Sequence, residues 1–177
     1  EKLVNLANLV KKQNETILDG KGTVAHVVIS AGGVAGATLN GITVKGGNAN
    51  YATGRTVNGA GINAKYGGGI YVDNAELIIT NCFIVNNYAK DRGAGLYLED
   101  KAKVAMFGVV LANNTADSNS GDGGAIFIND NTTSINLVNS TLVNNSANDG
   151  GGIRVDDDAT ILMFNNIFYQ NTSNNKN

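Results

Sequence analysis

Three short patterns recur along the chain, and they keep the same order each time. The first is a glycine-rich turn followed by alternating apolar residues, at 68–72, 94–98, 124–128 and 151–155. The second is an apolar strand that ends at Asn81, Gly108, Asn139 and Asn166. The third is a strand that runs into Asn86, Asn113, Asn144 and Asn171. The last two patterns both step by 27, 31 and 27 residues, which indicates one repeated structural unit.

The repeat extends toward the N-terminus. Asn40 fits the second pattern, and Val27 precedes it by 13 residues, the separation that also divides Ile126 from Asn139. The first step is 43 residues long because it contains an insertion at 47–67, and a connection of this length is often functional. We therefore expect five rungs, each one turn of a coil, that begin near Val27, Ile70, Leu96, Ile126 and Ile153.

Each rung is expected to hold three short strands, for example 69–73, 75–80 and 82–86. Side chains alternate between two faces of a strand, and one face is apolar in every rung. A single rung cannot bury this face, but stacked rungs share a continuous core. The sequence thus predicts an all-β, right-handed parallel β-helix, a solenoid of about five rungs of three strands. The expected inner columns are Val27, Ile70, Leu96, Ile126 and Ile153; Ile29, Val72, Leu98, Ile128 and Val155; Leu77, Val104, Ile135 and Leu162; and Ile79, Met106, Leu137 and Phe164.

The composition agrees with this fold and argues against two kinds of partner. There are 23 glycines and no proline, and asparagine is abundant. Glycine and asparagine accept left-handed turn conformations, and asparagines aligned at turns are expected to form a hydrogen-bonded ladder from rung to rung. A net charge of −2 without a basic cluster argues against nucleic acid. No apolar run reaches the ~20 residues of a membrane helix, so we expect no membrane insertion.

The two ends of the coil need covers, because open strand edges pair with other chains. Residues 1–14 are expected to form an N-terminal cap, with apolar residues at helical spacing over 2–12. A strand that precedes the first rung is the alternative. The β-helix domain is then 15–177. The polar C-terminal tail cannot cap the coil, so either the chain is a fragment or its last rung meets a protein partner or another copy.

The outer columns of the first strand are the main candidate site. Three aromatic residues and an arginine follow Val28 in one column, and Ser30, Asn129 and three acidic residues form the next. Aromatic rings stack on apolar sugar faces, and carboxylates accept sugar hydroxyls. The alternative is a purely structural role, since aromatic residues favour strand surfaces. The residues predicted to bind a polysaccharide or cell-surface glycan are Tyr71, Tyr97, Phe127, Arg154, Asp73, Glu99 and Asp156.

Two further features remain open. The outer face of the third strand carries Phe83, Val110 and Phe168 if Cys82 and Ile84 point inward. It is then more apolar than a free surface needs and is expected to be an interface or to lie under the insertion; another register would bury the phenylalanines. The acidic run Asp156, Asp157 and Asp158 has the oxygen ligands that Ca²⁺ prefers. A solvated acidic turn is the alternative, and we expect no other cofactor.

Several segments resemble a known group of proteins. Glu-Thr-Ile-Leu-Asp-Gly at 15–20, His-Val-Val at 26–28 and the segment 39–49 resemble secreted bacterial right-handed β-helix repeat proteins, whose superfamily includes the pectate lyases. Gly-Gly-Ala-Ile at 123–126 and Phe-x-x-Asn at 83–86 and 168–171 are similar to repeats of polymorphic outer-membrane adhesins. The resemblance covers residues 15–171. It implies a secreted or cell-surface setting in a bacterium, and adhesion or glycan binding.

Three classes of function follow. The first is a non-catalytic adhesion or glycan-binding module, and the second is a spacer or assembly module of a larger surface protein. The third is a polysaccharide lyase or hydrolase that acts on acidic glycans. Hydrolases need two convergent carboxylates, and no such pair is visible in the strand pattern. The single histidine, His26, has no nucleophile at a readable spacing. We therefore expect no catalytic residue.

Overall fold

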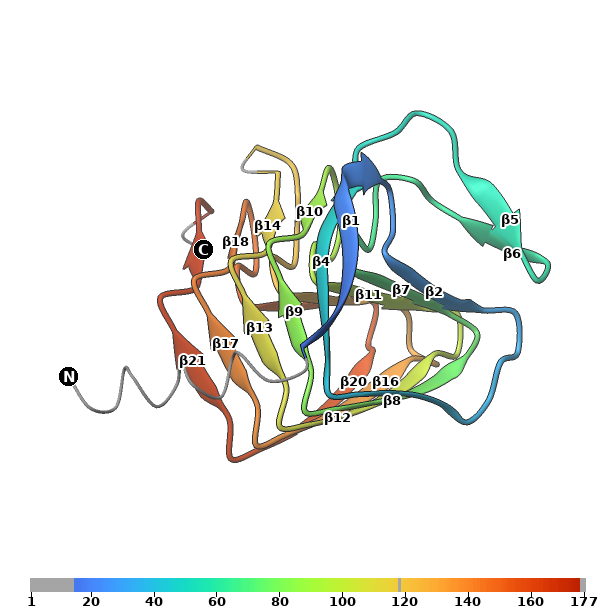
Figure 1. The fold of residues 1–177 in the computed structure, drawn as a ribbon. Helices are drawn as coiled ribbons and strands as arrows, with labels where there is room; N and C mark the ends of the chain where they lie inside the picture. The colour runs from blue at the N-terminus through green and yellow to red at the C-terminus, as the bar shows by residue number, and fades with distance from the viewer. Residues whose placement is uncertain (1–14, 118, 176–177) are drawn as a thin grey trace.

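The computed structural model describes residues 15–117 and 119–175, and the N-terminal cap predicted at 1–14 lies outside them. All regular elements of the described residues are β-strands, and they wind into a coil of stacked rungs (Figure 1). Strands pair in parallel with their equivalents one rung away, and a single antiparallel hairpin is the exception among the described residues. The predicted parallel β-helix is confirmed.

Three parallel sheets run along the coil. Sheet 1 contains β2 (Val28–Ala31), β7 (Ile70–Asp73), β11 (Leu96–Glu99), β15 (Ile126–Ile128) and β19 (Ile153–Val155). Sheet 2 contains β3 (Ala37–Asn40), β8 (Glu76–Thr80), β12 (Lys103–Phe107), β16 (Ser134–Val138) and β20 (Thr160–Phe164). Sheet 3 contains β1 (Thr16–Val24), β4 (Ile42–Ala49), β9 (Phe83–Val85), β13 (Val110–Ala112), β17 (Thr141–Val143) and β21 (Ile167–Tyr169).

Two additions distinguish the structure from the predicted five rungs. Because β1 pairs with β4, one turn precedes the first rung of sheets 1 and 2, so the coil has about six turns. A short fourth strand occurs in the later rungs, as β10 (Tyr88–Ala89), β14 (Thr115–Ala116), β18 (Ser146–Ala147) and β22 (Thr172–Ser173). These four strands join sheet 3 through β4, which gives that sheet ten strands. The insertion contains the hairpin of β5 (Arg55–Val57) and β6 (Ala60–Ile62).

The core fills the inside of the coil, and most of the predicted inner columns form it. Ile70, Leu96 and Ile126 pair from rung to rung and are fully buried. Cys82 and Ile84 also point into this core, as expected for the third strand. Each of these side chains packs on its equivalents above and below. The apolar residues that recur in the sequence are therefore the residues that form the core.

In the first rung the predicted register is wrong by one residue. Val28, not Val27, pairs with Ile70, so Ile29 lies beside Tyr71 on the outer face. Ser30 pairs with Val72 on the inner side. The turn after β2 contains three left-handed glycines, unlike the turns of later rungs. Asn40 pairs with Thr80, so Gly41 and not Asn40 is the equivalent of Asn81, and the one-residue offset runs through the whole rung.

The last rung also departs from the predicted register in sheets 2 and 3. The turn between β19 and β20 spans 156–159, one residue shorter than the turn 129–133 of the rung before. Ile161 and Met163 therefore enter the inner columns, whereas Leu162 and Phe164 point outward and are 64% and 73% exposed. Phe168 pairs with Leu142 and so lies on the inner side, not the outer side.

The asparagines hold the turns in two ways. Asn81 and Asn139 adopt left-handed conformations, with φ of 52° and 51°, that L-residues other than asparagine and aspartate seldom accept. A second asparagine, in the turn between the sheet 3 strand and the short fourth strand, forms the predicted ladder and is buried in three of the four rungs. Asn114 accepts from the Asn87 side chain at 3.0 Å and donates to Asn145 at 3.0 Å. The ladder members are Asn87, Asn114, Asn145 and Asn171.

Candidate functional site

The aromatic residues of sheet 1 form a stack on the outer face of the coil. Tyr71, Tyr97 and Phe127 pair in register across β7, β11 and β15. Their ring centroids lie 5.0 Å apart between the tyrosines and 5.7 Å apart between Tyr97 and Phe127. The predicted column is thus present, but all three side chains are 0% exposed.

The insertion is what covers this aromatic stack. Ile62 of β6 is buried against it, and Tyr66 lies with its ring centroid 4.9 Å from that of Tyr97. The hairpin of β5 and β6 lies beside β2 and β7 at the N-terminal end of the coil (Figure 1). The prediction of an exposed aromatic stripe is therefore wrong, because sequence periodicity does not show what an insertion packs against. Phe83 on sheet 3 is 47% exposed, so the insertion leaves that face open.

The polar neighbours of the aromatic stack are already engaged. Tyr71 and Tyr97 both donate hydrogen bonds to the carboxylate of Glu99, the second at 2.9 Å. Burial raises the pKa of both tyrosines, and the charge of Glu99 raises it further. The guanidinium of Arg92 lies 4.9 Å from the ring centroid of Phe127. These contacts stabilise the stack internally, which leaves Glu99 less able to receive a ligand.

Arg154 continues the column in the last rung and is paired as well. Its guanidinium contacts Asp149 and lies 3.5 Å from Asp156. Two of the seven predicted site residues, Arg154 and Asp156, thus neutralise each other. Asp157 and Asp158 are exposed and left-handed, with φ of 49° and 59°. Within 15–117 and 119–175, no three acidic, histidine or cysteine side chains converge as metal ligands. The three aspartates lie in the turn between β19 and β20.

Asp73 is the predicted site residue whose surroundings differ from the rest. It lies at the end of β7, where the hairpin tip meets the turns that follow β2, β7 and β11, and it lines a hollow of about 380 Å³. The hairpin approaches closely at Gly32, since a Cβ there would lie 2.2 Å from the carbonyl oxygen of Asn58. Asn58, Asn74 and Asp100 also line the hollow. We call this space the hairpin hollow.

Most of Asp73 is covered by its neighbours, but its carboxylate reaches the hollow and has no partner there. The residue is 6% exposed, and its side chain makes no hydrogen bond or ion pair within the described residues. Burial raises its pKa to about 6, and the charges of Glu99, Asp100 and Asp130 contribute to the rise. Buried polar groups in proteins almost always have partners, so this acceptor at the wall of a hollow is available to a ligand.

The sequence interpretation identified Asp73 but missed the other walls of the hairpin hollow. Asn58 belongs to the hairpin, which occurs once, whereas Gly32 and Asp100 lie in the left-handed turns that follow β2 and β11. One signal for the hairpin was present: Asn58-Gly59 between Thr56-Val57 and Ala60 is the residue pair that favours a two-residue hairpin turn. The pairing of β5 with β6 follows that turn.

The raised pKa of Asp73 predicts an unusual pH dependence of stability. Its ordinary value is 3.8, so the folded protein holds this proton more tightly than the unfolded chain, and stability falls as pH rises from about 4 to about 6. Asp73→Asn mimics the neutral form. We expect it to raise the free energy of unfolding by about 1 kcal/mol at pH 8, below the full conversion of the shift because water in the hollow screens the charge.

At pH 4 the same substitution should have little effect. Urea unfolding of both proteins at the two pH values measures the difference. Asp157→Asn is the matched control, because Asp157 is exposed and its left-handed backbone accepts asparagine. A pH-independent effect of Asp73→Asn would contradict the raised pKa.

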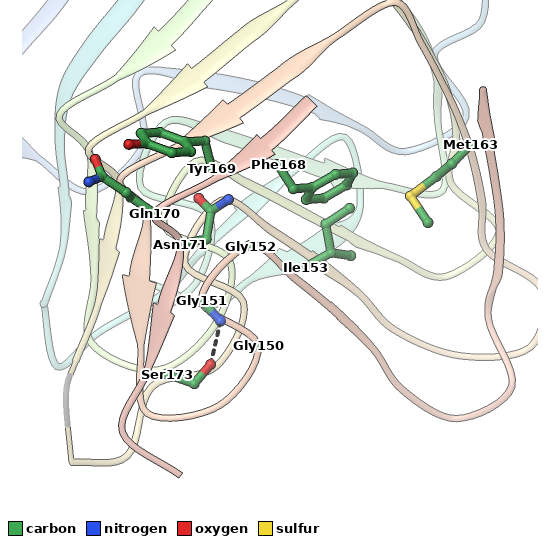
Figure 2. A pocket seen from close by; sticks show the side chains of 10 residues that line it. All are labelled: Gly150, Gly151, Gly152, Ile153, Met163, Phe168, Tyr169, Gln170, Asn171 and Ser173. Atoms are coloured by element: carbon green, nitrogen blue, oxygen red, sulfur yellow. Dashed lines mark hydrogen bonds between the residues drawn. The ribbon is translucent and has the colours of Figure 1, made fainter. Parts of the chain in front are cut away.

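A second hollow lies at the C-terminal end of the coil. It measures about 430 Å³, and Ile153, Met163 and Phe168 lie along it (Figure 2). The strands β19, β20, β21 and β22 are the last of their sheets among the described residues, so each has an edge without a neighbouring strand there. Exposed apolar side chains accompany these edges, including Leu162, Phe164 and Ile167.

His26 is placed for packing. It is buried, and its Nδ1 lies 3.0 Å from the carbonyl oxygen of Gly67. Its ring lies edge-on to Tyr71 at 5.3 Å, and burial lowers its pKa.

No helix of the described residues is long and apolar enough to cross a membrane.

Comparison with known proteins agrees with the geometry. The family model for the right-handed β-helix region matches residues 16–175. No significant match was found among curated proteins or among solved structures. The matched region spans nearly the whole coil, from β1 to β22. The chain belongs to the right-handed β-helix family.

Proposed function

We propose that this chain is a non-catalytic β-helix module that binds a glycan in the hairpin hollow, on the outer face of sheet 1. The proposal places the module in a secreted or cell-surface setting, where such binding serves adhesion. The observation that carries it is Asp73, a 6% exposed residue whose carboxylate has no hydrogen-bond partner at the wall of a 380 Å³ hollow. Ligand sites commonly occupy about 300–1,000 Å³.

The walls of the hairpin hollow suit a polyhydroxylated ligand. Asp73 and Asp100 supply carboxylate acceptors, and Asn58 and Asn74 supply amide donors and acceptors. A hydrogen bond to a carboxylate in this half-enclosed hollow is stronger than one at a free surface, because the surroundings are less polar than water. The hollow is built from turns on a rigid repeat scaffold, which is where binding residues are commonly found. This site replaces the aromatic stripe as the place of sugar binding.

Glycan binding can be tested with one conservative change. A glycan array identifies ligands of the unaltered protein, and calorimetry then compares Asp73→Asn with Asp157→Asn. We expect Asp73→Asn to weaken binding at least about tenfold, since a charge-assisted hydrogen bond of roughly 1.5–3 kcal/mol is lost. Asp157→Asn should bind as the unaltered protein does. Equal binding by both variants, or no bound glycan on the array, would overturn the proposal.

A role in assembly is the second candidate, and the C-terminal end of the coil favours it. Phe164 and Ile167 are 73% and 62% exposed beside strand edges that have no partner among the described residues. Such edges pair readily with further strands. Light scattering over a concentration series separates the two functions, because assembly raises the mean mass and glycan binding alone does not.

A further inference from the structure

The hairpin hollow carries charge of one sign. Two of its lining residues, Asp73 and Asp100, are acidic, and neither lysine nor arginine lines it. Ionised carboxylates accept hydrogen bonds and donate none. Lys101 and Arg55 belong to adjoining segments but do not line the hollow. The space is therefore rich in acceptors and negative in potential.

Two further carboxylates strengthen this potential. Glu99 and Asp130 act on Asp73 from β11 and from the turn after β15 and, with burial, raise its pKa. Glu99 is held by the two tyrosine hydroxyls, and Asp130 accepts from the backbone N–H of Asp100 at 2.7 Å. Lys103 on the neighbouring sheet pairs with Glu76 at 3.3 Å instead. The described residues thus leave the charge of Asp73 without a partner.

A cation would supply what the protein does not. A neutral sugar hydroxyl can donate a hydrogen bond to Asp73, but it cannot offset repulsion among four carboxylates. A primary ammonium donates up to three hydrogen bonds and brings a positive charge. Its attraction to the carboxylate is stronger in a half-enclosed hollow than in water. Metal coordination is not favoured, because no three ligand side chains converge in the described part of the chain.

We infer that the hairpin hollow takes the ammonium group of an amino sugar, with Asp73 as its direct partner and Asp100 at the rim. The inference rests on the proposed glycan-binding function and names its ligand class. A sugar whose amine is acetylated lacks both the charge and two of the donor hydrogens. The site therefore distinguishes free amino sugars from their N-acetylated forms.

Calorimetry at about pH 6.5 tests this with oligomers of glucosamine and of N-acetylglucosamine of equal length. We expect the glucosamine oligomer to bind at least tenfold more tightly, and the preference to disappear in Asp73→Asn but not in Asp157→Asn. The preference should shrink at pH 5, where Asp73 is largely protonated. Circular dichroism confirms that both variants are folded. Raised salt should weaken the preferred oligomer most.

Each other result has a definite meaning. Equal binding of the two oligomers, or binding of only the acetylated one, overturns the ammonium inference while glycan binding stands. If other glycans from the array bind and neither oligomer does, the ammonium inference is again overturned and glycan binding again stands. Absence of binding to every glycan overturns the proposed function itself. A lysine-rich peptide that binds when the glucosamine oligomer does not would show that the ammonium partner is a protein.

Discussion

Asn114→Ala is expected to lower the free energy of unfolding by about 3 kcal/mol, because it breaks the asparagine ladder in its middle. The side chain is 0% exposed. Its Oδ1 accepts from the backbone N–H and the side chain of Asn87 at 3.1 and 3.0 Å. Its Nδ2 donates to the Ile84 carbonyl at 2.8 Å and to Asn145 at 3.0 Å. Each buried group left without a partner costs about 1–3 kcal/mol. Urea unfolding measures the loss.

The matched control is Asn136→Ala, which makes the same chemical change on the exposed outer face of β16. We expect it to change stability by less than about 0.5 kcal/mol. A similar loss in the two variants would mean that alanine acts through strand propensity and not through the ladder. Unchanged stability of Asn114→Ala would show that the ladder is dispensable.

The asparagine ladder stabilises the interfaces between several neighbouring rungs. In a solenoid each rung contacts only its neighbours, so stability depends on the interfaces between rungs. Asn145 passes the pattern on by accepting from Asn114 and donating to Asn171 and to the Leu111 carbonyl. A break at Asn114 weakens the interfaces on both sides of its rung. This is why the central member of the ladder should show the largest effect.

The sequence allowed the coil to be predicted because the same residues that repeat are the ones that pack. Ile70, Leu96 and Ile126 recur at the rung spacing and occupy one inner column. Prediction failed where turn length changed. The turn before Ile161 is one residue shorter than its predecessor, and a shift of one residue exchanges the inner and outer faces of a strand. Leu162 points outward because β20 pairs with β16 in the shifted register, which the spacing of the sequence repeat does not reveal.

The candidate site could be predicted only in part for a related reason. The outward column of Tyr71, Tyr97 and Phe127 follows from alternation, and the structure has that column. Its burial depends on the hairpin, which occurs once and packs through residues such as Ile62 that no other rung repeats. The hairpin hollow arises from the same packing. Sites built by a unique insertion on a repeat are invisible to an argument from periodicity.

Tyr97→Ala is expected to destabilise the protein by about 4 kcal/mol, because Tyr97 is the centre of the covered aromatic stack. It is 0% exposed and contacts the rings of Tyr66, Tyr71 and Phe127. Removal of a large buried aromatic side chain commonly costs about 3–5 kcal/mol. The hairpin should also loosen, because Tyr66 loses the ring against which it lies. Urea unfolding measures the first effect, and hydrogen exchange of the amides in β5 and β6 measures the second.

Two other tyrosine variants separate packing from the other roles of this side chain. Tyr97→Phe keeps the ring and loses the contacts of the hydroxyl with Glu99 and Arg92, so it should cost about 1 kcal/mol. Tyr169→Ala removes a ring that is 60% exposed and should cost less than about 1 kcal/mol. If Tyr97→Ala instead kept full stability and lost glycan binding, the aromatic stack would be a binding surface that the hairpin uncovers. Lost stability with normal glycan binding at low temperature would show that the stack holds the hairpin, and that the ligand binds beside the stack in the hollow.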